Sequence, residues 1–260
     1  MQDSMFTLQT IELLMLGAGL GFFGGLFGIG GGIIAIPVLA MGFGMSQAMA
    51  QGTVLVMMVP NLLVSWWQYS RRHPIALSTM LKIGGVACVS TWLAAHAATS
   101  VNQSVLHVVF NGFLLLLALR LFLLKTNQTQ NFSSAHQPLA PRFMPWVGVV
   151  GGGCMGLLGV GGGLVATPLF TRWFGQKQVA AQGLSLALVA PSSLIALLSY
   201  NSAQKVDWHI GIALAIGGIL TVSIGVATAH RLPEAKMRGL FAVMLLVTAL
   251  WSLVRMGFGA

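Results

Sequence analysis

Two glycine runs contain the residues of this sequence that are best suited to bind a ligand. The first is GIGGG at 28–32 and the second is GVGGG at 159–163. Glycine lets the backbone turn sharply and approach a ligand closely. A helix that begins directly after such a turn presents free N–H groups and the positive end of its dipole, which together form an anion site. The expected binding residues are the last three glycines of each run: Gly30, Gly31, Gly32, Gly161, Gly162 and Gly163.

Both runs lie inside apolar segments, and each is followed after five residues by a proline, Pro37 or Pro168. Backbone without internal hydrogen bonds at membrane depth must face protein or a watery cavity. Two such breaks that meet near the bilayer midplane are typical of transporter sites, so the prolines are interpreted as hinges of the breaks. Close packing of helices through small residues is the alternative, and it explains the glycines at 21–25 equally well.

Polar side chains follow each run in a matched order, in QGTVLVMMVPN at 51–61 and QGLSLALVAPS at 182–192. Polar groups at membrane depth are costly and often line a pathway. Hydrogen bonding between helices is the alternative explanation. Each proline in these stretches frees a backbone carbonyl one turn earlier. The expected lining residues are Gln51, Thr53, Gln182 and Ser185, with Pro60 and Pro191 as hinges.

Cys154 stands beside the second run, in GGGCMG, and is included as a thiol that would touch a sulfur-containing ligand. A lone membrane cysteine otherwise acts as a small apolar side chain. The four acidic residues all fall at or near segment ends, so coupling through an intramembrane carboxylate is not expected. No cluster has metal-ligand spacing and no carboxylate pair suits acid–base catalysis. The sequence therefore predicts no catalytic residue, no metal, no cofactor and no enzyme activity.

The composition requires lipid as the main solvent. Hydrophobic residues make up 56% of the 260 residues and charged residues 7%, with a mean hydropathy of +0.86. Soluble domains carry about 25% charged residues. The net charge of +9 would suit nucleic acid if the basic residues formed one face, but they lie in short loops, where they set membrane orientation. We expect a polytopic membrane protein with no nucleic-acid partner. The N-terminus lacks the basic region of a secretory signal, so its first apolar segment is expected to remain in the mature protein.

Eight apolar segments follow one another along the chain, at 8–42, 46–68, 76–98, 103–124, 144–174, 178–200, 207–230 and 235–256. A spanning helix needs about 20 apolar residues, so six of the segments fit one crossing each. The first and fifth are longer, and glycines split them near the middle. Polar residues at 125–143 separate the two groups of four. The expected organisation is a first membrane repeat at 1–124, a cytoplasmic linker at 125–143 and a second membrane repeat at 144–260.

An internal repeat supports this division. Residues 28–70, moved by 131 positions, fall on 159–201 without a gap, and sixteen of the 43 pairs are identical. Matches at glutamine, proline and tyrosine do not arise from the apolar bias of the composition. The pattern therefore indicates duplication of one unit.

Basic residues indicate that the two copies are inverted. Arg71 and Arg72 follow the second segment of the first half, whereas Arg172 and Lys177 follow the first segment of the second half. Three crossings plus one re-entrant hairpin in each half would produce this inversion. The arm at 33–42 would be about 15 Å long as a helix, which is too short for a hydrocarbon core of about 30 Å.

The expected fold is an all-α polytopic membrane protein with two inverted repeats of about four helical segments. The first segment of each repeat is a glycine-broken re-entrant helical hairpin. Eight plain crossings in a parallel repeat remain the alternative.

Several motifs recur or stand out along the chain: the paired GxGGGxxxxPxL (Gly28 to Leu39, with Phe170 in place of the final Leu in the second copy), QGT and QGLS, Tyr69 and Tyr200, KVDW at 205–208 and the run RLPEAKMR at 231–238. Together they resemble the TauE/SafE sulfite exporter family. One departure is RRHPI at 71–75, where the second half has KVDW; it argues against a binding role for Asp207.

The resemblance implies a transporter of a small sulfur-containing anion in a bacterial cytoplasmic (inner) membrane. Sulfite, thiosulfate, sulfoacetate or a similar organosulfonate would sit between the two glycine breaks, and the halves would rock to expose it alternately. A non-transporting membrane assembly or partner-binding protein, an anion channel and an intramembrane enzyme are the alternatives. The sequence leaves the choice between monomer and homo-oligomer open.

Overall fold

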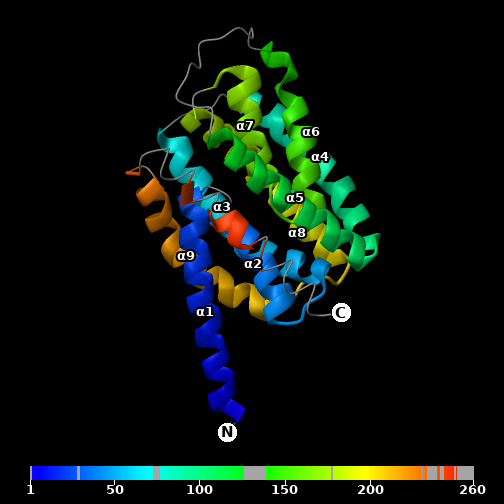
Figure 1. Ribbon diagram of the computed structural model, residues 1–260, viewed down its shortest axis with the longest axis vertical. Coiled ribbons are helices and arrows are strands. Elements are labelled where there is room, and N and C mark those ends of the chain that lie inside the picture. The colour runs from blue at the N-terminus through cyan, green and yellow to red at the C-terminus, as the bar shows by residue number, and fades with distance from the viewer. Residues whose placement is uncertain are drawn as a thin grey trace.

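The computed structural model of the chain describes residues 2–27, 30–72, 77–125, 139–176, 178–229 and parts of 231–250. Helices run throughout these ranges, and no strand occurs in them (Figure 1). The last predicted segment, 235–256, and the linker predicted at 125–143 lie largely outside the described residues. In chain order, the elements are α1 (Gln2–Phe27), α2 (Gly32–Pro37), the π-turn η1 (Val38–Gly42), α3 (Gln47–Arg72), α4 (Leu77–Ser100), α5 (Gln103–Lys125), the 3₁₀ turn η2 (Pro141–Phe143), α6 (Met144–Leu158), α7 (Gly162–Phe174), α8 (Gln178–Ser202) and α9 (Trp208–Ala229).

Among the described residues, five helices are long and apolar enough to cross a membrane, and shorter apolar helices accompany them. The prediction of an all-α polytopic membrane protein is therefore confirmed for the part of the chain that the structure describes. The five apolar spans are Thr10–Phe27, Gln47–Arg71, Ser78–Ser100, Ala180–Ser202 and Trp208–Ala229.

The glycine runs interrupt helices where the sequence predicts breaks. α1 ends at Phe27 and α2 begins at Gly32, while α6 ends at Leu158 and α7 begins at Gly162. The turns depend on glycines with positive φ, in the left-handed region that other residues avoid. Their φ angles are 73° at Gly30, 81° at Gly31, 66° at Gly159 and 96° at Gly161.

The two first arms differ in length. α1 has 26 residues, about 39 Å of helix, which is longer than the arm predicted at 13–27. α6 has 15 residues, about 22 Å. The apolar part of α1, Thr10–Phe27, has 18 residues, about 27 Å, which is slightly less than a hydrocarbon core of about 30 Å. α6 is shorter still.

Glycines spaced four residues apart bring helices of opposite halves into backbone contact. A Cβ at any of these glycines would collide with the backbone of the facing helix. Small residues at this spacing are the usual means of close packing between membrane helices. On α1 the pairs are Gly17–Leu214, Gly21–Gly218 and Gly25–Val222 with α9; on α6 they are Gly148–Ile83, Gly152–Ala87 and Gly156–Thr91 with α4.

Every pair in the first set becomes a pair of the second set when the residue numbers are shifted by 131 in opposite directions. The first helix of each half thus packs on a helix of the other half, α1 on α9 and α6 on α4 (Figure 1). The two sequence halves are interlocked, and neither forms a separate body in space.

Helices α3 and α8 lie together between these pairs and run antiparallel. Gln51, near the start of α3, contacts Tyr200, near the end of α8. Tyr69, near the end of α3, contacts Gln182, near the start of α8. The two helices occupy matched places in the repeat, yet they point in opposite directions.

Candidate functional site

The two glycine breaks meet inside the protein. A Cβ placed on Gly32 would stand 3.1 Å from Cγ2 of Val160, which belongs to the second break. A Cβ on Gly159 would stand 3.0 Å from Cβ of Gln51 on α3. All four residues are buried. The structure therefore brings both breaks and one of the predicted lining amides together.

Helices α2 and α7 both begin at this junction. Gly31 and Gly161 precede them in the left-handed conformation, and no side chain caps either start. The first N–H groups of a helix have no partner inside it. The predicted donors Gly32, Gly162 and Gly163 occupy such positions. Gly30 has another function, since its N–H donates to the Gly24 carbonyl over 3.4 Å and so shapes the turn.

Gln51 is a fully buried predicted side chain that contacts the second break. It is 0% exposed, and its Oε1 accepts a hydrogen bond of 2.8 Å from the Tyr200 hydroxyl. Its Nε2 is buried and has no hydrogen-bond partner in the described part of the chain. A buried amide without a partner costs about 1–3 kcal/mol. Gln51 therefore presents two N–H donors that have no partner among the described residues.

Gln182 occupies the matched position on α8 and is less enclosed. It is partly buried, and its Oε1 accepts from the Tyr69 hydroxyl over 3.4 Å. The two glutamines thus share one type of partner, a tyrosine hydroxyl from the opposite helix.

The predicted hydroxyl residues bind backbone near the junction. Thr53 Oγ1 accepts from the Asp207 N–H over 2.9 Å, and Asp207 Oδ1 accepts from the Ile210 N–H over 3.1 Å at the start of α9. Ser185 donates to the Gly163 carbonyl over 3.1 Å. Thr53 therefore anchors the start of α9, while Ser185 anchors the start of α7.

The other predicted residues lie at different distances from the junction. Cys154 lies on α6, five residues before Gly159, and is partly exposed. The four predicted hinge prolines all lie within helices: Pro37 in α2, Pro168 in α7, Pro60 in α3 and Pro191 in α8.

Three residues at or near the site were not assigned to it from the sequence. Tyr69 and Tyr200 were noted as a repeated pair, but their hydrogen bonds to the glutamines were not predicted. Asn61, also on α3, is 0% exposed, and neither atom of its amide has a partner among the described residues. The sequence does contain a signal for the tyrosines: Tyr69 and Tyr200 are 131 positions apart, as are Gln51 and Gln182.

The predicted lining side chains at the junction are uncharged, and Asp207, which lies next to Thr53, uses a carboxylate oxygen to cap α9. Gln51, Thr53 and Ser185 carry no charge, and the described residues contain no group of three His, Cys, Asp or Glu side chains that would hold a metal ion. Donors at this junction are backbone N–H groups and an amide. Such a set favours an anion over a cation, because nothing there supplies a cluster of negative oxygens.

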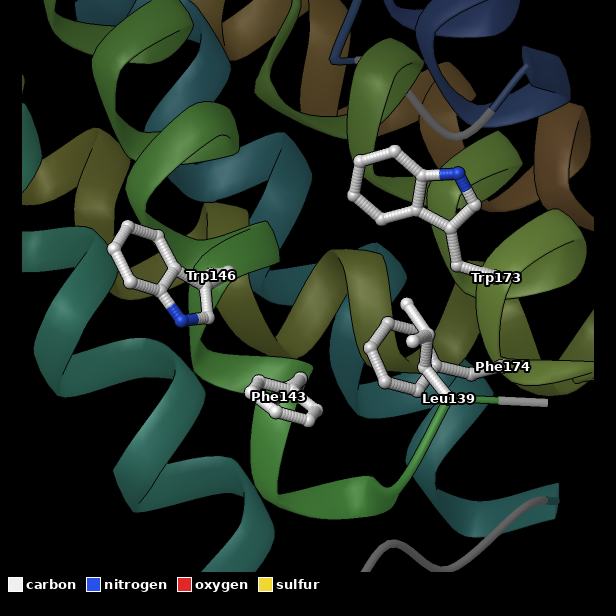
Figure 2. Close-up of a pocket in the computed structure, with 5 residues that line it drawn as sticks. All are labelled: Leu139, Phe143, Trp146, Trp173 and Phe174. Atoms are coloured by element: carbon white, nitrogen blue, oxygen red, sulfur yellow. The ribbon is translucent and has the colours of Figure 1, made fainter.

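A second feature is an apolar groove of about 180 Å³ near the ends of α6 and α7. Figure 2 shows five side chains around it: Leu139, Phe143, Trp146, Trp173 and Phe174. Arg142 stacks over the Phe143 ring at 5.0 Å. Trp146 is twelve residues before Leu158, about 18 Å along the helix. The groove is therefore separate from the glycine junction, and its aromatic lining is typical of a membrane–water interface.

Residues 13–252 match the family model described as sulfite exporter TauE/SafE. The chain is 25% identical to a probable membrane transporter protein of Methanocaldococcus jannaschii, over 96% of this chain and 97% of that protein. It is 25% identical to a probable membrane transporter protein of Xylella fastidiosa, over 94% and 97% of the two chains. It is 23% identical to the probable membrane transporter protein YunE of Bacillus subtilis, over 91% and 94%. No solved structure matches the chain.

Proposed function

The chain belongs to the sulfite exporter TauE/SafE family, and on that basis we propose that it transports a small sulfur-containing anion such as sulfite, thiosulfate, sulfoacetate or a similar organosulfonate. The family and the names of its relatives indicate an integral membrane transporter and not an enzyme. The substrate class is our proposal.

One observation carries the proposal: the two glycine breaks meet beside an amide with unused N–H donors. Gly32 lies against Val160, and Gly159 lies against Gln51, whose Nε2 is buried without a partner among the described residues. Oxygen atoms of a sulfite or sulfonate group accept several hydrogen bonds at once. Helix-start N–H groups and the Gln51 amide would replace the water that the anion loses. Because these hydrogen-bond donors include no buried Lys or Arg, they would bind the anion weakly enough to release it.

We propose that the halves form an inverted repeat whose glycine-broken segments are re-entrant hairpins. The antiparallel course of α3 and α8 supports inversion, because matched crossings of a parallel repeat would point the same way. The second arm of the first hairpin, 32–42, has eleven residues, about 16 Å of helix, against a hydrocarbon core of about 30 Å.

Basic residues indicate which face of the membrane each end of α3 would approach. Arg71 and Arg172 are exposed near the Tyr69 end, and Lys205 lies near the Tyr200 end. Basic residues concentrate on the cytoplasmic side, so the Tyr69 end would face the cytoplasm. The linker at 125–143 would then be cytoplasmic, between membrane repeats at 1–124 and 144–260, in the bacterial inner membrane.

Alternating access would follow from movement of interlocked bodies. One body would comprise α1, α3 and α9, and the other α6, α8 and α4, since these helices pack together in matched sets. The anion would lie where the bodies meet, at the glycine junction.

Reconstitution into liposomes tests the proposal. Uptake of labelled sulfite, thiosulfate and sulfoacetate is expected for at least one of the three, and Gly31→Val or Gly162→Val is expected to abolish it. Gly19→Ala is the matched control, because a Cβ at Gly19 would meet nothing within 4 Å. Unchanged transport in folded Gly31 and Gly162 variants would overturn the site. No uptake of any sulfur anion by the unmodified protein would overturn the substrate class.

A further inference from the structure

Helices α3 and α8 each carry a glutamine, a proline and a tyrosine at the same spacing. On α3, Gln51, Pro60 and Tyr69 follow one another at intervals of nine, and on α8, Gln182, Pro191 and Tyr200 do the same. Eighteen residues complete five turns of an α-helix, so the glutamine and tyrosine of each helix lie on the same face. The proline of each helix falls halfway between them.

This spacing lets the two helices bond to each other at both ends. Tyr200 donates to Gln51 over 2.8 Å, and Tyr69 donates to Gln182 over 3.4 Å. Within one helix, the glutamine and tyrosine are about 27 Å apart along the axis, close to the thickness of the hydrocarbon core, about 30 Å. The two bonds therefore lie near opposite faces of the membrane, and the Tyr200–Gln51 bond borders the glycine junction, because Gln51 contacts Gly159.

Both bonds also cross between the two proposed bodies. α3 packs on α9 and α8 packs on α4, and α3 and α8 pack on each other where the bodies meet. Other buried side-chain bonds stay within one body: Thr91 on α4 donates to the Gly152 carbonyl on α6 over 2.9 Å. The Tyr200 hydroxyl also reaches the Gly156 carbonyl on α6 over 3.2 Å, within the same body as α8. A relative movement of the bodies would break the two tyrosine–glutamine bonds and leave the Thr91 bond and the Tyr200–Gly156 contact intact.

The two bonds differ in strength in this structure. At the Tyr200 end the distance is short and both partners are 0% exposed. At the Tyr69 end the distance is 3.4 Å and Gln182 is partly exposed. A hydrogen bond weakens as it lengthens and as water reaches it. One end of the α3–α8 contact thus has a short, fully buried bond, while the other has a longer bond to a partly exposed glutamine.

We propose that the two tyrosine–glutamine pairs are the gates of the transport path and open in alternation. The Tyr200–Gln51 pair closes the outer side and the Tyr69–Gln182 pair closes the cytoplasmic side. Pro60 and Pro191 let each helix bend midway, since a proline removes one backbone hydrogen bond. One gate therefore opens while the other holds. The inference rests on the proposed transport function and adds the residues that control access.

Gln51 also connects the outer gate to the anion. Its Oε1 is engaged by Tyr200, and this bond fixes the amide with Nε2 free. An anion at the glycine junction would bind the same amide that holds the gate. Occupancy of the site and closure of the outer side are therefore coupled through one side chain.

Sided thiol labelling tests the gates without depending on transport. A Val160→Cys reporter at the junction is introduced into a Cys88→Ser, Cys154→Ser background, in right-side-out and inside-out vesicles. A membrane-impermeant maleimide is applied to each. Tyr200→Phe is expected to raise the labelling rate about three- to tenfold from outside only, and Tyr69→Phe by a similar factor from the cytoplasmic side only, the factor that one hydrogen bond supplies.

Each tyrosine variant is the control for the other, and Thr91→Val controls for loss of a buried hydroxyl within one body. If Tyr200→Phe does not fold, Gln51→Met removes the acceptor with similar volume and carries the same expectation. Labelling that changes equally from both sides, or not at all, would overturn the gates. Sided labelling in a protein that moves no sulfur anion would uphold the gates and overturn only the proposed substrate.

Discussion

Gly152 of α6 lies directly against Ala87 of α4, so closely that a Cβ on the glycine would collide with the Ala87 backbone. Its neighbour Gly153 faces elsewhere, and a Cβ there would stand 3.5 Å from Ser90 Oγ, an ordinary contact. Substitutions at these two adjacent glycines of α6 therefore distinguish the effect of close helix packing from the effect of replacing a glycine within a helix.

Gly152→Ala is expected to lower stability by about 1–3 kcal/mol through overpacking. Gly153→Ala is expected to leave stability unchanged or to raise it by up to about 1 kcal/mol, because alanine is the better helix former. Thermal unfolding midpoints in detergent measure both. Equal destabilisation by the two changes would contradict the packing described here.

Three glycines separate backbone strain from steric collision. Gly31 has φ 81° and would carry a Cβ against the Leu20 carbonyl; Gly44 has φ 66° with nothing within 4 Å; Gly19 has neither constraint. Alanine at a left-handed position costs about 1–2 kcal/mol. We expect unfolding midpoints in the order Gly19→Ala, Gly44→Ala, Gly31→Ala, from highest to lowest. A Gly31→Ala protein as stable as Gly44→Ala would show that the break relaxes without cost.

Gln51 and Gln47 form a matched pair for the anion site. Both are buried, and the Nε2 of each lacks a partner in the described chain. Gln51→Leu is expected to raise KM for the transported anion at least about tenfold, the effect of one hydrogen bond to a charged group. Gln47→Leu is expected to leave KM unchanged, and its melting temperature should not fall, since it removes an unsatisfied donor. Similar KM values for the unmodified protein, Gln51→Leu and Gln47→Leu would exclude Gln51 as an anion ligand.

Asp207 is expected to stabilise the start of α9 without binding substrate. Its Oδ1 accepts the Ile210 N–H, the position of a helix N-cap. Asp207→Ala should cost about 0.5–2 kcal/mol, whereas Asp207→Asn, an equally good cap, should retain stability. Transport by Asp207→Asn should match that of the unmodified protein. A stable Asp207→Asn protein without transport would place this residue in the site instead.

Much of the fold was predictable because its signals are local. Apolar length identifies the helices, and the glycine runs mark the breaks that follow Phe27 and Leu158. The greater length of α1 was not predicted, since its first residues, including Asp3 and Glu12, are polar enough to look like a tail in the sequence.

The partners of the site residues were harder to predict. A buried threonine is satisfied equally well by an anion, a carbonyl or an N–H group, so the contact of Thr53 with Asp207 requires the tertiary structure. The exchange of first helices between halves joins Gly17 to Leu214, and nothing local in either helix specifies that pairing. The repeat offset contained the information for the Tyr200–Gln51 bond, but only once α3 and α8 were known to be antiparallel.

The packing of α1 on α9 has a consequence for biosynthesis. Gly17 leaves the ribosome almost 200 residues before its contact Leu214, an interval of roughly 10–40 s at about 5–20 residues per second. Throughout that time the glycine face of α1 must remain in the bilayer, or against the insertion machinery, without its partner. α6, whose partner α4 is already in place, docks at once. Assembly of the nascent chain is therefore sequential in its second half and delayed in its first.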